Sequence, residues 1–386
     1  MKILIISPTP THPQNAGNRS RIFEMCCLLK QANFSVSFLN LKKEEGDDTA
    51  MKSFFGDAYY EFDSNSIKEK KTIPSVWSKI AHKLRKLIPT PYYKYNRNVD
   101  FYYDNRLDVF LEKNFTKDQF THVLVEYVVF SKALEYFDSK TIKIIDTHDV
   151  LSNRYKVFLE QNVKPQWYSL FPKEEAKGLN RADKIIAIQN IEKEHFKDLT
   201  SKEIVVIGHY TKTSKVKSDT DALLFIGSNN KINIDGLNHF ISKVFPKIVA
   251  QYPKIKLIVA GSIKKDIKNI IPHPNCFFYG AYQDTEEIYS QGSIVIIPIL
   301  YGTGLKIKTI EALANGKAVV SYNEGIFGIE NDSDKPIYLL AENDADFSQH
   351  VLNLIDNDKL KSDLENNAYA YMLSYNEEIV TKINSL

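Results

Sequence analysis

Short apolar runs alternate with helical patterns along the whole chain. The runs are nearly continuous in valine, isoleucine, leucine and phenylalanine, which is typical of parallel strands covered on both faces. We expect strands at 2–7, 35–41, 122–129, 143–148 and 184–189 in the first half, and at 203–208, 222–227, 256–261, 276–280, 293–299, 317–322 and 336–340 in the second. Helical patterns lie between them, for example at 19–32, 235–252 and 344–357, and predict an α/β fold with parallel sheets.

A polar and charged stretch, 208–222, divides the chain almost in half. Each half begins its own series of strands and helices, and 386 residues are too many for one ordinary core. The pattern predicts two doubly wound, Rossmann-like domains that face each other across a cleft, with ligands at the carboxyl ends of the strands. We place the first domain at 1–207, a linker at 208–221, the second domain at 222–368, and a C-terminal helix, a candidate to cross back to the first domain, at 369–386.

Composition and charge exclude several classes of protein. Lysine and arginine number 50 against 48 acidic residues, and this balance argues against a nucleic-acid-binding protein. The three cysteines, Cys26, Cys27 and Cys276, suit neither a disulfide framework nor a zinc site, and indicate a reducing compartment. No apolar run approaches the ~20 residues of a membrane span, and the N-terminus does not resemble a signal peptide. We therefore expect a cytoplasmic protein.

The stretch YGTGLKIKTIEALANGKAVVS, residues 301–321, is the best candidate for a functional site. A helix is expected to begin near Leu305, because Gly302 and Gly304 punctuate the turn before it, and to stop at Gly316. Such a helix start presents backbone N–H groups without partners, and glycines let a ligand approach them. The stretch predicts a phosphate site.

Charged residues on the same stretch support this hypothesis. Lys306 and Lys308 add positive charge at the helix start, and Glu311 follows at the next turn. The alternative is that the lysines are solvated and that Glu311 only pairs with one of them. The sequence does not decide which lysine would contact a phosphate.

The second half resembles the C-terminal domain of a GT-B glycosyltransferase of family 4, the group 1 transferases. The matching stretches, in order, are LLFIGSNNKINIDGLNHFISKVFPKI (223–248), YPKIKLIVAGS (252–262) and the segment 275–329, which contains GTGLKIKTIEALANGK. The first half agrees through its opening MKILIISPTP, the loop and helix that follow, IIDTHDV (144–150) and NRADKIIAIQNIEKEHF (180–196).

This resemblance implies a retaining enzyme that transfers a sugar from a nucleoside diphosphate sugar to a glycan, lipid-linked or protein acceptor, in the synthesis of surface polysaccharide or glycoconjugates. It implies that no metal or other cofactor is needed, that the second domain holds the nucleotide, and that the first presents the acceptor. A sugar-nucleotide 2-epimerase of the same fold and a non-catalytic binding subunit are the alternatives.

The resemblance also implies roles for individual residues. Glu311 matches the glutamate that holds the ribose hydroxyls. A second glutamate usually contacts the donor sugar, and here Thr303 stands in its place. The sequence GTGLKIK at this point resembles a variant branch of the family that carries GTGxKxK. Donor contacts are expected from Gly17, Gly227, Ser228, Gly280, Ala281, Tyr282, Gly302, Thr303, Gly304, Leu305 and Glu311. Catalytic roles are expected from His148, Lys231, Lys306 and Lys308.

Some of these assignments have structural alternatives. Lys231 is also consistent with an exposed loop lysine, and His148 with a structural histidine. Arg19 and Arg21, which follow the glycine loop, are candidates for an acceptor or phosphate group but could be solvated.

The segment 76–98 is a candidate for membrane association. It places Trp77, Leu84 and Ile88 on one helical face and basic residues on most of the remainder, a pattern that suits an anionic membrane surface. The alternative is a helix packed on its own domain. We therefore also consider attachment at the cytoplasmic face of a membrane.

Overall fold

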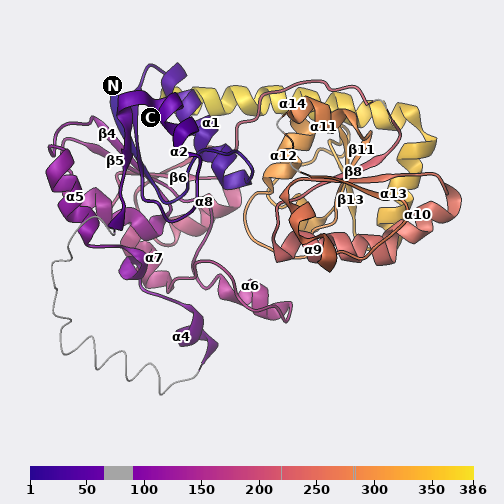
Figure 1. The fold of residues 1–386 in the computed structure, drawn as a ribbon, viewed down its shortest axis with the longest axis horizontal. Helices are drawn as coiled ribbons and strands as arrows, with labels where there is room; N and C mark the ends of the chain where they lie inside the picture. Colours follow the sequence, from indigo (N-terminus) through magenta and orange to yellow (C-terminus); the bar gives the residue numbers. More distant parts are fainter. Residues whose placement is uncertain (65–89, 219, 281, 283) are drawn as a thin grey trace. The chain divides into compact units, whose positions relative to one another are not determined.

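The structure, a computed structural model, describes residues 1–64, 90–218, 220–280, 282 and 284–386. The chain folds into two compact units, shown in Figure 1. The first consists of Met1–Pro13 and Met25–Gly208, and the second of Gln14–Glu24 and His209–Leu386. The second unit therefore includes a short segment from the N-terminal part of the chain.

The first unit is built, within the described residues, on a seven-stranded parallel sheet of order β3-β2-β1-β4-β5-β6-β7. Its strands are β1 (Lys2–Ser7), β2 (Ser35–Asn40), β3 (Tyr59–Glu61), β4 (His122–Glu126), β5 (Ile142–Asp146), β6 (Lys184–Ala187) and β7 (Glu203–Val206). The order reverses between β1 and β4, as in doubly wound folds. Both faces of β1 are buried, since Leu4 and Ile6 join one core while Ile3 and Ile5 are equally inaccessible on the other side.

Helices separate these strands, and several are short or of the 3₁₀ type. The α-helices are α1 (Gly17–Gln31), α2 (Asp48–Phe55), α4 (Pro91–Tyr95), α5 (Arg106–Asn114), α6 (Tyr155–Glu160), α7 (Pro172–Leu179) and α8 (Asn190–Lys197). The 3₁₀ segments are η1 (Gly56–Ala58), η3 (Val99–Tyr102) and η4 (Val128–Tyr136). Cys26 is fully buried on α1, as expected for an apolar helix face.

The second unit contains, in the part that the structure describes, a six-stranded parallel sheet of order β10-β9-β8-β11-β12-β13. Its strands are β8 (Leu223–Ile226), β9 (Leu257–Ala260), β10 (Cys276–Gly280), β11 (Ile294–Ile297), β12 (Ala318–Tyr322) and β13 (Leu339–Ala341). Its helical elements are α9 (Lys231–His239), the π-helical η5 (Phe240–Val244), α10 (Phe245–Gln251), η6 (Ser262–Asn269), α11 (Thr285–Ser290), α12 (Ile307–Ala314), η7 (Asn323–Gly325), α13 (Asp344–Asp356) and α14 (Asp358–Asn384).

Alternate residues of the second sheet enter two different cores. Leu223 and Phe225 of β8 pack with α9, α10 and α13, whereas Leu224 and Ile226 pack with α11, α12 and α14. Figure 1 shows these helices around the second sheet. Because both faces are covered, the strands need apolar residues at every position, which explains the continuous apolar runs in the sequence.

The predicted α/β class with doubly wound parallel sheets is confirmed. Each expected apolar run contains a strand, although most strands are shorter than the run. The apolar run 122–129 is a strand only to Glu126, because the left-handed Tyr127 (φ 67°) ends it and η4 follows. Strand β7, which falls in the second half of the chain, forms the edge of the first sheet. The three-residue β3 was not expected, because its run is too short to show a pattern.

The predicted linker packs against the second unit. Asn376 of α14 donates to the Thr211 carbonyl at 2.8 Å, and the Tyr375 hydroxyl accepts from the His209 N–H at 3.0 Å. The Lys317 ammonium donates to the Val216 carbonyl at 2.8 Å. The C-terminal helix is one element, α14, which continues through the boundary placed at 368/369.

Two expectations concern residues that the structure does not describe. The predicted basic helix falls mostly within 65–89, which lies outside the described residues, and Ala281 does as well. Among the described residues, no helix combines the length and the apolar character that crossing a membrane requires.

Candidate functional site

The loops after β8 and β11 lie where the order of the second sheet reverses. The two strands are paired, with Leu223 opposite Ile294. Gly302 and Gly304, in the loop between β11 and α12, have φ angles of 138° and 69°, so this backbone needs glycine. Carboxyl ends of parallel strands at such a reversal are the usual place for a ligand in doubly wound folds.

Helix α12 begins at Ile307, two residues later than expected. Lys306 is still extended, with φ −87° and ψ 98°, and forms the N-cap of the helix. The predicted stop at Gly316 is present, with φ 61°. The first turn of α12 therefore presents its N–H groups beside the loop that holds Gly302, Thr303, Gly304 and Leu305.

The two lysines of this stretch have different surroundings. The Lys306 ammonium donates to the carbonyls of Thr303 (3.0 Å) and Gly304 (2.8 Å), so it holds the shape of its own loop. The Lys308 ammonium donates to Asn233 Oδ1 at 2.5 Å and lies 4.7 Å from the centre of the Phe225 ring. Lys308 is thus the lysine held by side chains of other elements.

Asn233 connects Lys308 to the loop after β8. This buried residue of α9 donates through Nδ2 to the Ser228 carbonyl (2.8 Å) and hydroxyl (3.1 Å). Its N–H is in turn capped by the Asn230 side chain at 3.0 Å. One amide therefore fixes both the predicted donor-binding Ser228 and the Lys308 ammonium.

Glu311 lies one turn beyond Lys308, and burial changes the pKa of both groups. Burial lowers the pKa of Lys308 to about 7, the Lys306 charge adds to the decrease, and Glu311 opposes it. Burial raises the pKa of Glu311 to about 7, with Lys308 acting in the opposite direction. Both groups therefore titrate near neutrality, where a charged ligand can change their protonation.

Tyr282 lies near Glu311, as its proposed place in the same site requires. Burial raises the pKa of its hydroxyl, and the Glu311 carboxylate contributes to the increase. Gly280, which precedes it, has φ 92° and accepts a hydrogen bond from the Gly261 N–H at 2.6 Å. The Gly227 carbonyl would lie 2.4 Å from a Cβ atom at Gly261, so the loops after β8, β9 and β10 are tightly packed.

Lys231 is on the same unit but is engaged elsewhere. Its ammonium, on an exposed side chain, donates to both carboxylate oxygens of Asp235 at 2.8 Å. Asp235 also accepts from the Tyr301 hydroxyl at 2.5 Å. The geometry supports the alternative interpretation of Lys231 as an exposed surface lysine.

The start of α1 lies against α12. A Cβ atom at Gly17 would come within 2.9 Å of the Ile307 side chain, so glycine permits this approach. Arg19 is partly exposed, whereas Arg21 is only 2% exposed. Arg21 lies near His209, where burial lowers the histidine pKa to about 3 and the arginine charge contributes. Arg21 is therefore enclosed within this unit, and the alternative of a solvated arginine does not apply to it.

His148 belongs to the first unit and lies at the carboxyl end of β5. Its Nε2 forms a 2.5 Å hydrogen bond with Glu126 Oε2, and its ring stacks on Tyr127 at 4.2 Å between centroids. Both His148 and Tyr127 are left-handed, with φ 60° and 67°. Such strained positions are typical of functional sites.

Glu126, Asp146 and His148 also have the composition of a metal-binding group, since their ligand atoms lie within 4.8 Å of one another. In the structure, the short Nε2–Oε2 contact is a hydrogen bond between two of these three side chains. The arrangement is that of a histidine oriented by a buried carboxylate.

Sequence reasoning missed Asn233, Glu126 and Tyr127. Asn233 lies inside a helix and Glu126 inside an apolar run, so neither residue stands in a recognisable motif. For Glu126, the sequence offered one indication, which is its place at the end of β4. This strand pairs with β5, the strand that leads to His148.

Comparison with known proteins agrees with this geometry. Residues 220–357 match the family described as glycosyl transferases group 1. A Klebsiella pneumoniae protein, described as an uncharacterized 44.6 kDa protein in the cps region, is 24% identical over 397 residues, covering 96% of this chain and 95% of its own. A Campylobacter jejuni N,N'-diacetylbacillosaminyl-diphospho-undecaprenol alpha-1,3-N-acetylgalactosaminyltransferase is 30% identical over 106 residues, 27% of this chain and 28% of its own.

The fold is shared with solved structures over nearly the entire chain. A mutant of S. aureus TarM, solved in complex with Fondaparinux, alpha-GlcNAc-glycerol and UDP, superimposes with a TM-score of 0.67 at 13% identity and covers 99% of both chains. Residues 220–357 therefore form a glycosyl transferases group 1 domain, and the chain is a glycosyltransferase with a GT-B fold.

Proposed function

We propose that the chain is a retaining, metal-independent glycosyltransferase that moves a sugar from a nucleoside diphosphate donor to a glycan, lipid-linked or protein acceptor in surface polysaccharide or glycoconjugate synthesis. The observation that carries the proposal is the arrangement at the start of α12. A partly buried lysine and a partly buried glutamate, both with pKa values shifted to about 7, stand beside a glycine turn and the first N–H groups of a helix.

This arrangement suits the departure of a nucleoside diphosphate. As the bond between the anomeric carbon and the diphosphate oxygen breaks, negative charge grows on the leaving phosphate. Lys308, held by Asn233, and the helix N–H groups can stabilise that charge in place of a metal ion. Glu311 would accept hydrogen bonds from the ribose hydroxyls, which places its carboxylate on the nucleoside side.

Relatives suggest which substrates to test first. TarM was solved with UDP, and the Campylobacter jejuni enzyme acts, by its name, on a sugar linked to diphospho-undecaprenol. The Klebsiella pneumoniae relative comes from a cps region. We therefore favour a UDP-sugar as donor and a diphospho-undecaprenol-linked glycan as acceptor.

Calorimetry with UDP, GDP and dTDP, followed by turnover with the corresponding sugars, tests the proposal. We expect one nucleotide to bind at micromolar to millimolar concentration, and its sugar to be transferred with the anomeric configuration kept. Absence of nucleotide binding at millimolar concentration would exclude the proposal. Release of an epimerised donor without acceptor would instead identify an epimerase.

Thr303 gives weight to the non-catalytic alternative, because a threonine stands where a glutamate is expected to contact the donor sugar. That alternative predicts nucleotide binding without transfer or donor hydrolysis. Activity retained in excess EDTA is expected for the transferase, and loss of activity restored by a divalent cation would reject the metal-independent mechanism.

Membrane association is a separate part of the proposal. We expect the full chain to sediment with anionic vesicles at low salt, and the quadruple change of Lys79, Lys83, Arg85 and Lys86 to glutamate to abolish sedimentation. A chain that remains in the supernatant at every lipid composition would exclude this attachment.

A further inference from the structure

A cavity of the second unit lies outside the candidate nucleotide site. It has a volume of about 510 Å³ and is formed by the loop before β13 and the middle of α14. Its lining residues are Glu330, Asn331, Asp332, Lys335, Ile337, Asn367, Ala370, Tyr371 and Ser374. None of them belongs to the nucleotide site, and the volume falls within the ~300–1,000 Å³ of small-molecule sites.

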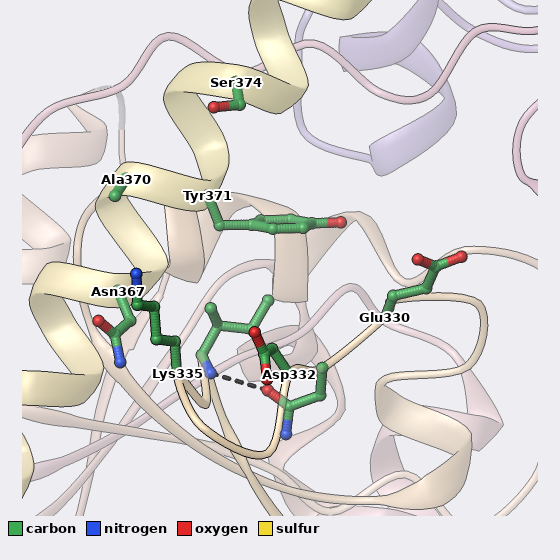
Figure 2. A pocket seen from close by; sticks show the side chains of 9 residues that line it. Glu330, Asp332, Lys335, Asn367, Ala370, Tyr371 and Ser374 are labelled. Carbon is green, nitrogen blue, oxygen red and sulfur yellow. Dashed lines mark hydrogen bonds between the residues drawn. The ribbon is translucent and has the colours of Figure 1, made fainter.

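Tyr371 supplies an aromatic surface to this cavity. Tyr375, one helical turn later, stacks on the ring at 5.9 Å between centroids and 24° between planes. Asn367, one turn before Tyr371, and Ala370, the residue that precedes it, also line the cavity, so this part of α14 forms one wall. Figure 2 shows the ring extending from α14, with its hydroxyl toward the side where Glu330 lies.

The loop opposite α14 is held in a defined shape. Asn331 Oδ1 accepts from the Ile337 N–H at 2.8 Å, and the Pro336 carbonyl accepts from Asn367 Nδ2 at 3.1 Å. The Tyr338 hydroxyl donates to the Ile329 carbonyl at 2.9 Å. The cavity is therefore preformed and does not require a ligand to order its wall.

Three polar side chains of the rim have groups available for a ligand. Within the described residues, the Glu330 carboxylate, the Lys335 ammonium and the Ser374 hydroxyl form no hydrogen bonds, although all line the cavity. The Glu330 charge is close enough to contribute to the raised pKa of Tyr371, which burial brings to about 12. Two carboxylates, Glu330 and Asp332, face a single ammonium, so the lining disfavours anions.

These features match a pyranose ring. The C–H groups on the faces of a pyranose suit an aromatic surface and the apolar Ile337. The hydroxyl groups around its edge suit the carboxylates, amides and hydroxyl of the lining. We propose that this Tyr371 cavity is a secondary binding site for a neutral sugar residue of a glycan. As part of the proposed transferase, it would hold a sugar of the acceptor away from the reacting end.

Saturation-transfer NMR on the full chain tests the site directly. The probes are methyl α-glucoside, methyl α-galactoside and N,N'-diacetylchitobiose, with glucuronic acid as the anionic comparison, all at millimolar concentration. We expect ring-proton signals from at least one neutral sugar and a weaker signal from glucuronic acid. Tyr371→Ala should reduce the neutral-sugar signal about fivefold or more, and Tyr371→Phe should keep it, because the ring remains.

Two further variants make the result specific. Ala370→Trp fills the cavity without removing Tyr371 and should also abolish the signal, whereas Leu373→Ala, on an exposed residue of α14 that does not line the cavity, should not. Thermal unfolding checks that each variant folds.

Excess UDP should leave the sugar signal unchanged, because the nucleotide site is separate. The test is therefore independent of the proposed function, whose failure would appear as absent nucleotide binding. No signal from any neutral sugar, or a signal that survives both Tyr371→Ala and Ala370→Trp, would overturn the proposal. Glucuronic acid binding as strongly as the neutral sugars would overturn it as well.

Discussion

The two units each carry a charged cluster at the carboxyl ends of their strands, and the clusters are built in opposite ways. In the first unit, His148 is hydrogen-bonded to the fully buried Glu126 and stacked on Tyr127, so its imidazole has a carboxylate partner within the protein. In the second unit, Lys308 is held by the neutral Asn233, and Glu311 lies nearby with its pKa raised.

This difference indicates different tasks. An imidazole hydrogen-bonded to a buried carboxylate is fixed in orientation, so it can position a neutral group such as a sugar hydroxyl. The neutral Asn233 leaves the Lys308 ammonium without a carboxylate hydrogen-bond partner, and burial lowers its pKa, so an incoming anion would favour its charged form. The second cluster therefore contains a cation that a bound anion would stabilise.

Removing the charge of Lys308 should have the largest effect. Lys308→Met keeps the length of the side chain but cannot stabilise the leaving diphosphate, so kcat should fall about 100-fold or more. Initial rates with saturating donor measure this change. The variant should be as stable as the wild type or more so in thermal unfolding, because a charge whose pKa is lowered by desolvation is removed.

Lys306→Met is the matched control. Its ammonium bonds to carbonyls of its own loop, so its loss should disturb the loop and cost less activity than the loss of Lys308. If both variants keep full activity, the interpretation of α12 as an anion site is wrong.

Glu311 should control nucleotide affinity and its dependence on pH. Glu311→Gln should weaken nucleotide binding by about 1–3 kcal/mol in calorimetry, because a charge-assisted contact to the ribose is lost. In the wild type, affinity should fall below about pH 7, where Glu311 becomes protonated, and above about pH 7, where Lys308 loses its proton. The optimum should therefore lie near neutrality.

Each variant should remove one side of this profile. Glu311→Gln should flatten the acidic side, and Lys308→Met the alkaline side. A wild-type affinity that does not change between about pH 6 and 8 would contradict the shared titration of this pair.

The fold could be predicted from the sequence, whereas the site could be predicted only in part. Continuous apolar runs such as 293–299 indicate strands that are buried on both faces, and Gly316 indicates the end of a helix. Both features could be predicted because each depends on residues that are close together in the sequence. The distinction between Lys306 and Lys308 could not be predicted, since it depends on Asn233, which lies far away in the sequence. The pairing of Lys231 with Asp235 could not be predicted either, because it depends on a helix whose start the sequence did not locate.

The pairing of Glu126 with His148 should affect turnover rather than nucleotide binding. Glu126→Gln keeps the size of the side chain but removes the charge that orients the imidazole, so we expect about a five- to tenfold lower kcat. The dissociation constant of the nucleotide should be unchanged, because the nucleotide site lies on the second unit. Tyr127→Phe is the control, since it keeps the stacked ring and should remain close to the wild-type rate. Equal losses of affinity and rate in Glu126→Gln would contradict the separation of tasks between the two clusters.

Lys231 should give the smallest effect. Its ammonium is exposed and already paired with Asp235, and exposed pairs contribute only about 0–1 kcal/mol, so Lys231→Ala should change the nucleotide dissociation constant less than about threefold. Calorimetry on this variant, beside Lys197→Ala as an equally exposed lysine of a helical pair in the first unit, measures the difference. A loss of about tenfold or more for Lys231→Ala alone would mean that Lys231 leaves Asp235 when the nucleotide binds. In that case the phosphate-binding role that the sequence predicts for Lys231 would be restored, and the second cluster would contain two cations instead of one.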